Sequence, residues 1–261
     1  MSQISDQSAI GWTGVVLADG PAHNSALHLG GTVVHTSSQS GLALRWTEHG
    51  PVAPTQTFVR TLSLAVKRAM DLVLALGALI FFAPFLLAVA VAVKLSTRGS
   101  VLFTQDRVGL GGKLFKTYKF RTMHADLSDP TGRQQTTRND ARISSVGKAL
   151  RRFSIDELPQ LLNVVRGEMS IVGPRPHVPG MLAAGIPYEE LVPYYNMRYL
   201  MKPGLSGWAQ ANGYRGPTES ALPAKARINH DIAYIQNFSP ALDVWIILMT
   251  LKSEFVTGNG L

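Results

Sequence analysis

Two adjacent carboxylates, Asp156 and Glu157, are the residues of this chain with the clearest chemical potential. Neighbouring side chains on a helix or tight turn point in different directions, so the two groups would take separate roles and not share one proton. One can attack an electrophilic phosphorus and form an acyl-phosphate, which divides a difficult displacement into two easier steps. The other can bind Mg²⁺, which usually takes one or two carboxylates together with substrate phosphates. The pair therefore predicts chemistry on a phosphorylated substrate.

A purely structural role for the same residues is the alternative. Ser154 and Glu157 match the S-x-x-E pattern of a capping box, and acidic residues are favoured in the first turn of a helix. Pro159 complicates this pattern, because proline is best accommodated at the first helical position. A helix beginning there would leave Asp156 and Glu157 on the preceding turn. Helix capping and catalysis are both expectations for this pair.

Basic side chains near the carboxylates predict an anionic ligand. Arg151 lies just upstream, and Arg175 stands between two prolines that restrict its backbone. A planar guanidinium held in this way suits bidentate phosphate binding. Lys119 and Arg121 would share one face of a predicted strand at 114–123, because strand side chains alternate with a period of two. These four residues are the predicted substrate and phosphate-binding groups, and solvated surface charges are the alternative.

The elements that must position these residues begin with a membrane segment. Residues 72–93 form an apolar run, and about 22 residues at ~1.5 Å each reach ~33 Å, enough to cross a bilayer core of ~30 Å. Basic residues flank both ends, and a single crossing can place only one such flank in the cytoplasm. Pro84 removes a backbone donor and kinks the helix. We expect a re-entrant helix with its break at Ala83 and Pro84; a kinked single-pass helix is the alternative.

The chain therefore divides into three predicted parts. Residues 1–58 are expected to be a mostly disordered tail, with a short strand near 32–34 or 42–46. Residues 59–98 are the re-entrant membrane helix, and 99–261 are the cytoplasmic catalytic domain. That domain is predicted to be a small α/β fold, mixed and mostly helical, with interfacial amphipathic helices. Its expected elements are strands at 101–103 and 114–123 and helices at 147–153, 158–166, 188–202, 222–237 and 242–255.

Composition narrows the function classes. The formal net charge is +8 and the pI is about 9.9, which indicates anionic partners such as lipid or phosphorylated ligands. The membrane segment argues against a nucleic-acid partner. The chain has no cysteine, which excludes disulfides, a thiolate nucleophile and a Cys-ligated zinc site. Its seven histidines show no HExxH spacing, so a zinc site is not expected.

Six motifs occur in a fixed order along about residues 66–256. They are KRAMD at 67–71, FTQDRVG at 103–109, KFRTM at 119–123, LRRFSIDELPQ at 150–160, VGPRP at 172–176 and KPGLSGW at 202–208. In this order they resemble the bacterial sugar transferase family, the monotopic polyprenyl-phosphate phosphoglycosyl transferases. The segment 207–216 resembles members that initiate exopolysaccharides with glucose or galactose. Two positions depart from the family pattern, Ala83 where serine is frequent and Ala141 where proline is frequent.

The resemblance implies an activity and a location. Such enzymes transfer a hexose-1-phosphate from a UDP-sugar to undecaprenyl phosphate at the cytoplasmic face of the inner membrane. Membrane lipid is a further implied partner. The resemblance implies that Asp156 is a nucleophile that forms a phosphosugar intermediate and releases UMP. It also implies that Glu157 binds the Mg²⁺ cofactor, and that Arg151 and Arg175 contact phosphates. A homo-oligomer is compatible with the sequence. The rival expectation is a non-catalytic basic membrane-anchored protein that binds anionic lipid or a partner.

Overall fold

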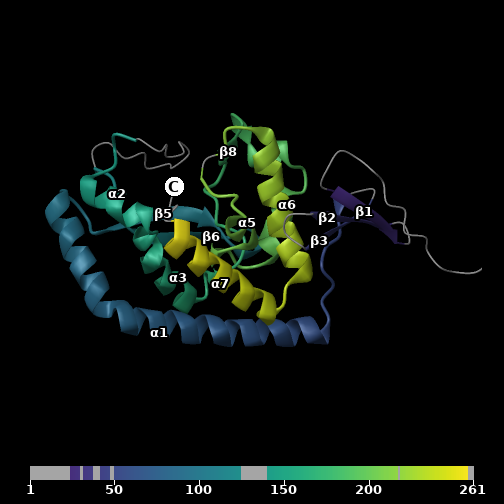
Figure 1. Ribbon diagram of the computed structural model, residues 1–261, viewed down its shortest axis with the longest axis horizontal. Coiled ribbons are helices and arrows are strands. Elements are labelled where there is room, and N and C mark those ends of the chain that lie inside the picture. Colours follow the sequence, from purple (N-terminus) through teal and green to yellow (C-terminus); the bar gives the residue numbers. More distant parts are fainter. Residues whose placement is uncertain are drawn as a thin grey trace, which may run out of the picture. The chain divides into compact units, whose positions relative to one another are not determined.

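The structure is a computed structural model that describes residues 24–29, 32–37, 42–47, 50–124, 140–216 and 218–257. The chain divides after Val52 into two compact units (Figure 1). Helices and short strands are mixed in it, which confirms the predicted class. The predicted limits of the tail, the membrane helix and the catalytic domain stay predictions.

The first unit is a four-stranded antiparallel sheet. Its order is β1 (Asn24–Leu29), β2 (Thr32–Ser37), β3 (Ala43–Thr47) and β4 (Gly50–Pro51). The sequence predicted no more than a short strand within this range, so the four-stranded sheet differs from the prediction. Its basis is cross-strand pairing, with Val33 opposite Trp46, and such partners cannot be recognised from one segment alone. The predicted disorder of residues 1–23 falls outside the described residues.

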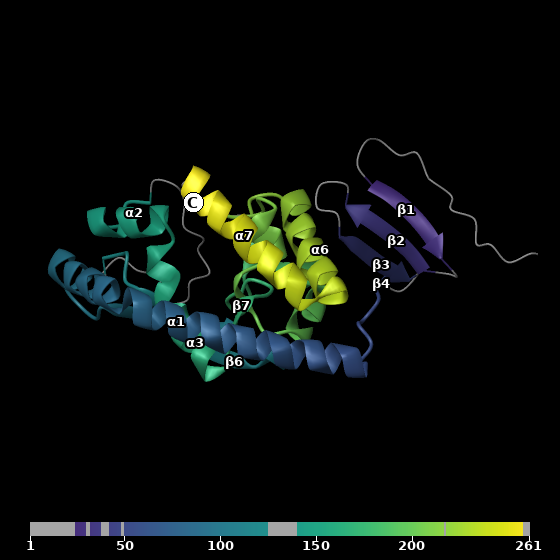
Figure 2. The same cartoon turned by 60° about the horizontal axis from the view of Figure 1, so that its bottom comes forward.

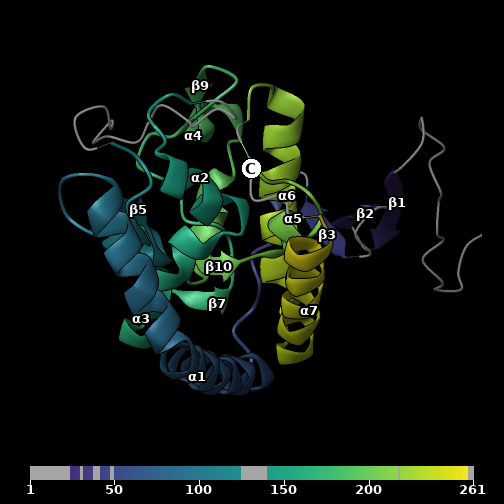
Figure 3. The same ribbon diagram turned by 60° about the vertical axis from the view of Figure 1, so that its left-hand side comes forward.

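One helix of 39 residues, α1 (Phe58–Ser96), contains the whole apolar run. The Thr57 hydroxyl caps it by accepting a hydrogen bond from the Arg60 backbone N–H at 3.2 Å. The helix is long and apolar enough to cross a membrane. Pro84 lies inside α1, and Figure 3 looks along its first arm, from which the second arm turns away. The expected break is therefore a bend in a continuous helix, since proline removes one hydrogen bond and crowds the preceding turn.

Both arms of α1 pack against other elements of the second unit, to which α1 itself belongs. Ala75, before the proline, lies in an apolar cluster with Val164 and Met169. Val93, after the proline, lies in a second cluster with Phe120. The two ends of the apolar helix are thus attached to one folded body.

Two charged side chains, one helical turn apart on α1, attach this helix to the short strand β7 (Ser170–Val172). Lys67 Nζ donates to the Val172 carbonyl at 2.8 Å and forms an ion pair with Asp243 at 2.5 Å. Asp71 Oδ1 accepts hydrogen bonds from the Ser170 hydroxyl at 3.0 Å and from the Ile171 backbone N–H at 2.9 Å. Lys67, Asp71 and Asp243 are all buried. Helix α1 therefore fixes the strand that leads into the VGPRP motif.

An antiparallel hairpin follows α1, and its strands correspond to those predicted at 101–103 and 114–123, although the first extends to residue 108. It consists of β5 (Leu102–Val108) and β6 (Leu114–Phe120), joined by a turn with the 3₁₀ helix η1 (Leu110–Gly112). Gly111 in this turn has φ 65°, a conformation that favours glycine. Gln105 pairs with Thr117 across the hairpin. Because side chains alternate along a strand, every second residue before and after this pair lies on the same face of the hairpin. That face carries Lys119.

The remaining elements are short except for two C-terminal helices. They are α2 (Ser145–Arg152), η2 (Ile155–Gln160), α3 (Leu161–Arg166), β8 (Leu182–Ala183), β9 (Ile186–Pro187), α4 (Tyr188–Leu191), η3 (Tyr195–Leu200), β10 (Gly204–Ser206), α5 (Trp208–Ala211), α6 (Ala221–Asn237) and α7 (Pro240–Thr257). Strand β10 pairs in parallel with β7. The helix predicted at 188–202 is divided into α4 and η3, because Pro193 lacks an N–H and restricts the residue before it.

Candidate active site

The adjacent carboxylates lie in the first turn of the 3₁₀ helix η2. Ser154, just before this helix, has φ 53° and ψ 21°, in the left-handed region, so the chain turns sharply after α2. The Ser154 side chain makes no capping hydrogen bond to η2. The Glu157 carboxylate binds basic side chains and does not reach back to the backbone. The capping-box interpretation is therefore wrong.

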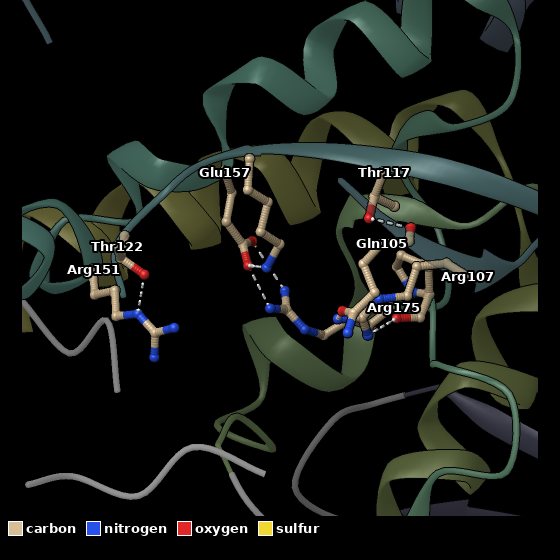
Figure 4. A network of polar contacts seen from close by, with 9 residues as sticks. Gln105, Arg107, Thr117, Thr122, Arg151, Glu157 and Arg175 are labelled. Atoms are coloured by element: carbon tan, nitrogen blue, oxygen red, sulfur yellow. Dashed lines mark hydrogen bonds and ion pairs between the residues drawn. The ribbon is translucent and has the colours of Figure 1, made fainter. Parts of the chain in front are cut away.

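Glu157 is the centre of an ion-pair network (Figure 4). Its Oε1 accepts hydrogen bonds from Lys119 Nζ and Arg175 Nη2, both at 2.6 Å, and its Oε2 accepts one from Arg175 Nη1 at 3.1 Å. Burial alone would raise the pKa of Glu157. The charges of Arg175 and Lys119 outweigh that effect and hold the pKa well below its usual range. Glu157 is therefore a carboxylate at neutral pH.

Asp156 has a different environment from its neighbour. Its side chain is buried, and within the described residues it accepts no hydrogen bond. Burial raises the pKa of Asp156, the Lys119 charge lowers it, and the Glu157 charge raises it further; the net direction is upward. The structure thus separates the two carboxylates: Glu157 is ion-paired, whereas Asp156 is buried and receives no hydrogen bond from the residues that the structure describes. That the two carboxylates take separate chemical roles stays a prediction.

The loop that carries Arg175 is held by the backbone of β10. Gly173 N–H donates to the Ser206 carbonyl at 2.9 Å, and Gly204 N–H donates to the Pro174 carbonyl at 3.0 Å. A Cβ atom added at Gly204 would lie 2.0 Å from the Gly173 nitrogen, so this approach of two backbones requires glycine. The prediction of a fixed guanidinium is thus realised by tertiary contacts as well as by the flanking prolines.

A second arginine supports this loop, and the sequence analysis missed it. Arg198 Nη2 donates to the Arg175 carbonyl at 2.6 Å, and Arg198 Nε forms a buried ion pair with Asp231 at 2.8 Å. Burial alone would lower the pKa of Arg198, but the Asp231 charge raises it, so the guanidinium stays ionised. The two partners are far apart in sequence, so no spacing pattern could have identified them.

Arg107 on β5 is another residue that the sequence analysis missed. It donates to the Pro176 carbonyl at 3.0 Å and to Gln105 Oε1 at 2.5 Å. The period-two alternation of the hairpin was a usable signal, since it places Arg107 on the same face as Lys119. A small hollow that is partly open to solvent, here called the Arg107 hollow, lies at this face. It is lined by Arg107, Thr117, Lys119, Gln160, Arg175 and Pro176.

The other two predicted basic residues, Arg151 and Arg121, lie in different places. Arg151 Nε donates to Thr122 Oγ1 at 2.8 Å, and its charge acts on Asp156, so its phosphate-binding role stays a prediction that this position allows. Burial lowers the pKa of Arg151, and the Asp156 charge raises it. The prediction for Arg121 is wrong, because its guanidinium donates to the Ser100 carbonyl and to the carbonyls of Val93 and Thr97 at the end of α1. Strand β6 ends at Phe120, so the alternation that places Lys119 stops before Arg121.

The carboxylates can also be examined as a metal site. Within the described residues no group of three or more His, Cys, Asp or Glu side chains gathers. A pair of carboxylates is nevertheless sufficient for Mg²⁺ when substrate phosphates supply further oxygens. The hydrogen bonds from Lys119 and Arg175 use three of the roughly four lone-pair sites of Glu157. About one site of Glu157 therefore remains for a magnesium ion that is bound together with a phosphorylated substrate, and Mg²⁺ as the cofactor stays a prediction.

Known proteins are similar to this chain over most of its length. The family model described as bacterial sugar transferase matches residues 62–257. An exopolysaccharide production protein of Rhizobium leguminosarum bv. phaseoli is 51% identical over 199 residues, which cover 76% of this chain and 100% of that protein. An undecaprenyl-phosphate glucose phosphotransferase of Komagataeibacter xylinus is 44% identical over 214 residues, 81% of this chain and 40% of the relative.

A third relative is the UDP-glucose:undecaprenyl-phosphate glucose-1-phosphate transferase of Escherichia coli (strain K12). It is 43% identical over 207 residues, 79% of this chain and 44% of the relative. The chain thus spans the whole Rhizobium protein but less than half the length of the other two. The similar region includes every element that contributes a residue to the candidate site.

Proposed function

The chain belongs to the bacterial sugar transferase family, and from this premise we propose that it transfers glucose-1-phosphate from UDP-glucose to undecaprenyl phosphate, with release of UMP. The family match confirms the prediction of a sugar-phosphate transferase, and it argues against the non-catalytic alternative. One observation carries the proposal: a desolvated carboxylate, Asp156, adjoins an ionised carboxylate that two cations hold. The names of two relatives support glucose as the sugar.

The proposed chemistry has two displacements at one phosphorus. An Asp156 oxygen bonds to the β-phosphorus of the donor, the bond to the bridging oxygen breaks, and UMP leaves with that oxygen. A phosphate oxygen of undecaprenyl phosphate then bonds to the same phosphorus, and the bond to Asp156 breaks. The carboxylate is restored, and the lipid carries a diphosphate-linked sugar. A carboxylate without hydrogen-bond donors has little solvation to lose before it attacks, which supports this role for Asp156.

The surrounding charges support phosphoryl transfer. The reaction depends on positioning and on stabilising negative charge more than on other covalent chemistry. Arg175 and Lys119 would bind donor phosphate oxygens next to Glu157, and Arg151 would act from the side of Asp156. We propose that Glu157 holds Mg²⁺, which would neutralise charge on the phosphates when it is bound.

The attachment of α1 supports a re-entrant topology at the cytoplasmic face of the inner membrane. Lys67 before the bend and Val93 after it both contact the part of the second unit that carries the active site. A folded polar domain cannot lie on both sides of a bilayer, so both ends of α1 belong on one side. Between them Ile80, Phe81 and Leu87 are 76%, 78% and 68% exposed and would face lipid. One leaflet is therefore the proposed depth of insertion.

Helix α7 supports an additional contact with the membrane interface. The view in Figure 2 brings forward the side of the second unit on which α1 and α7 lie, and these helices are in contact. Trp245 and Leu248 on α7 are 57% and 56% exposed. Amphipathic helices with such residues lie in the headgroup region. This arrangement would bring the water-borne UDP-sugar and the lipid phosphate to the same site, and homo-oligomerisation stays a prediction.

The proposed activity is tested by an assay for UMP. The purified full chain is mixed with undecaprenyl phosphate and a panel of UDP-sugars, with Mg²⁺ or with EDTA. We expect UMP release to be fastest with UDP-glucose and to be lost with EDTA, since the metal would neutralise phosphate charge. Equal rates with and without Mg²⁺ would contradict the metal proposal. Absence of UMP with every sugar would contradict the activity.

The topology is tested by labelling single cysteines, and the native chain, which has none, provides the background. Gln56→Cys and Arg98→Cys introduce thiols at exposed positions on the two flanks of α1. We expect a membrane-impermeant maleimide to label both from the cytoplasmic side of inverted vesicles and neither from the opposite side of intact spheroplasts. Labelling of the two positions from opposite sides would show a single-pass helix.

A further inference from the structure

The Arg107 hollow contains more positive charge than its carboxylate neighbour balances. Lys119 and Arg175 both pair with Glu157, whereas Arg107 donates to a backbone carbonyl and a neutral amide. Within the described residues Arg107 forms no ion pair, and its buried Nε has no hydrogen-bond partner. Burial and the charge of Arg175 lower the pKa of Arg107 to about 10, so the group is still cationic at pH 7. The charge of Glu157 acts on Arg107 without a direct ion pair, and a buried cation that no carboxylate of the described residues contacts favours an anionic ligand.

A neutral side chain beside Arg107, that of Gln160, can also bind an anionic ligand. Gln160 is only 3% exposed and lines the hollow, and within the described part of the chain its side chain makes no hydrogen bond. A buried amide normally has partners. Its N–H groups are therefore available to an oxygen-rich ligand. The hollow also shares Lys119 and Arg175 with the Glu157 network, so an anion bound there lies next to the carboxylate pair.

We propose that the Arg107 hollow binds the diphosphate of the nucleotide-sugar donor, and that Arg107 is a further phosphate-binding residue of this protein. The inference rests on the proposed function for the identity of the ligand. Two phosphate sources are present in that reaction, the diphosphate of the donor and the phosphate monoester of the lipid. The diphosphate is favoured because two phosphoryl groups can use both the cations shared with Glu157 and the separate guanidinium of Arg107.

The test measures binding of UDP to the full chain by isothermal titration calorimetry. Arg107→Met removes the charge and the guanidinium fork, so we expect the Kd for UDP to rise at least about 30-fold. Arg107→Lys keeps the charge but loses the fork, and an intermediate rise of about fivefold is expected. Lys116→Met is the matched control, because Lys116 is an exposed cation of the same hairpin that pairs with Asp106. Its Kd for UDP should be unchanged.

The second arm separates the two phosphate sources. For Arg107→Met we expect the KM for the UDP-sugar to rise and the KM for undecaprenyl phosphate to stay within about twofold. A raised KM for the lipid with unchanged UDP binding would assign the hollow to the acceptor and overturn the proposal. Gln160→Met provides a charge-neutral variant if Arg107→Met does not fold, and it should weaken UDP binding about threefold to tenfold. An unchanged affinity for UDP in whichever of the Arg107→Met and Gln160→Met variants folds would also overturn the proposal.

UDP binding does not require the covalent step. Asp156→Asn should therefore bind UDP even if the nucleophile lies elsewhere, and failure of the nucleophile assignment leaves this result intact. The binding measurement thus tests the Arg107 hollow separately from the chemistry.

Discussion

An Asp156→Asn variant is expected to release UMP from UDP-glucose at least about 10³-fold more slowly than the unchanged chain. The amide is close in size to the carboxylate but cannot form the proposed acyl-phosphate. The substituted position is buried without a hydrogen bond from the described residues, and the pKa of the carboxylate is raised there. Removing a poorly solvated charge should therefore leave the melting temperature unchanged or higher. Loss of activity would then reflect chemistry and not unfolding.

Mass spectrometry of enzyme quenched during turnover provides the direct check. The unchanged chain should carry a phosphohexose on the peptide that contains residue 156, and the Asp156→Asn variant should not. Asp106→Asn is the matched control, since Asp106 is an exposed acid that pairs with Lys116 on the hairpin. A phosphohexose on another residue, or an Asp156→Asn variant with normal UMP release, would remove the nucleophile assignment.

The same assignment predicts a pH dependence. Nucleophilic attack requires the ionised carboxylate, and burial raises the pKa of Asp156 above the usual value. UMP release should therefore decline as the pH falls through this raised pKa, at a higher pH than an ordinary aspartate would give. Glu157, whose pKa is lowered by Arg175 and Lys119, stays ionised over that range. A rate that is independent of pH down to about 4 would contradict this role for Asp156.

Replacing Lys67 by methionine is expected to lower the free energy of unfolding by about 3–5 kcal/mol, because it leaves the buried carboxylate of Asp243 without its cation. The carboxylate would retain a hydrogen bond from the Tyr234 hydroxyl at 2.6 Å. Lys67 also donates to the Val172 carbonyl, so its loss frees the strand that precedes the VGPRP motif. Chemical denaturation of the chain in detergent micelles measures the effect.

Two further variants make this result specific. Lys94→Met removes an exposed cation near the other end of α1 and should change the free energy of unfolding by less than about 0.5 kcal/mol. Lys67→Met combined with Asp243→Leu removes both charges, and it should recover most of the lost stability, because the cost arises from one uncompensated charge. Equal destabilisation by the single and double variants would show that packing, and not the ion pair, accounts for the loss.

Local patterns in the sequence were sufficient for several elements. The apolar run with a proline predicted α1, because length and composition are properties of one segment. Two strands were predicted at 101–103 and 114–123, and they correspond to β5 and β6, while their pairing as a hairpin came from the structure. The adjacent pair Asp156 and Glu157 was predicted to be reactive from residue type and adjacency. Arg175 was predicted to be a phosphate-binding residue from its flanking prolines. Each of these inferences depends on neighbours within a few residues.

The tertiary structure alone decided how these residues are used. It excluded helix capping for Ser154 and Glu157, since the carboxylate pairs with Lys119 and Arg175 from other segments. It moved Arg121 from the phosphate site to the end of α1, because the strand stops one residue earlier. The sheet of the first unit, likewise, depends on pairing between strands that are individually weak signals.

Sequence by itself therefore determined which local elements form and which residue types are available for phosphoryl transfer. It did not determine which charges meet, because partners such as Arg198 and Asp231 come from separate segments, and their pairing depends on how the helices and strands pack. The separation of Asp156 from Glu157 has the same origin. Their pKa values shift in opposite directions, because packing buries both carboxylates but brings hydrogen bonds from two cations, Lys119 and Arg175, only to Glu157.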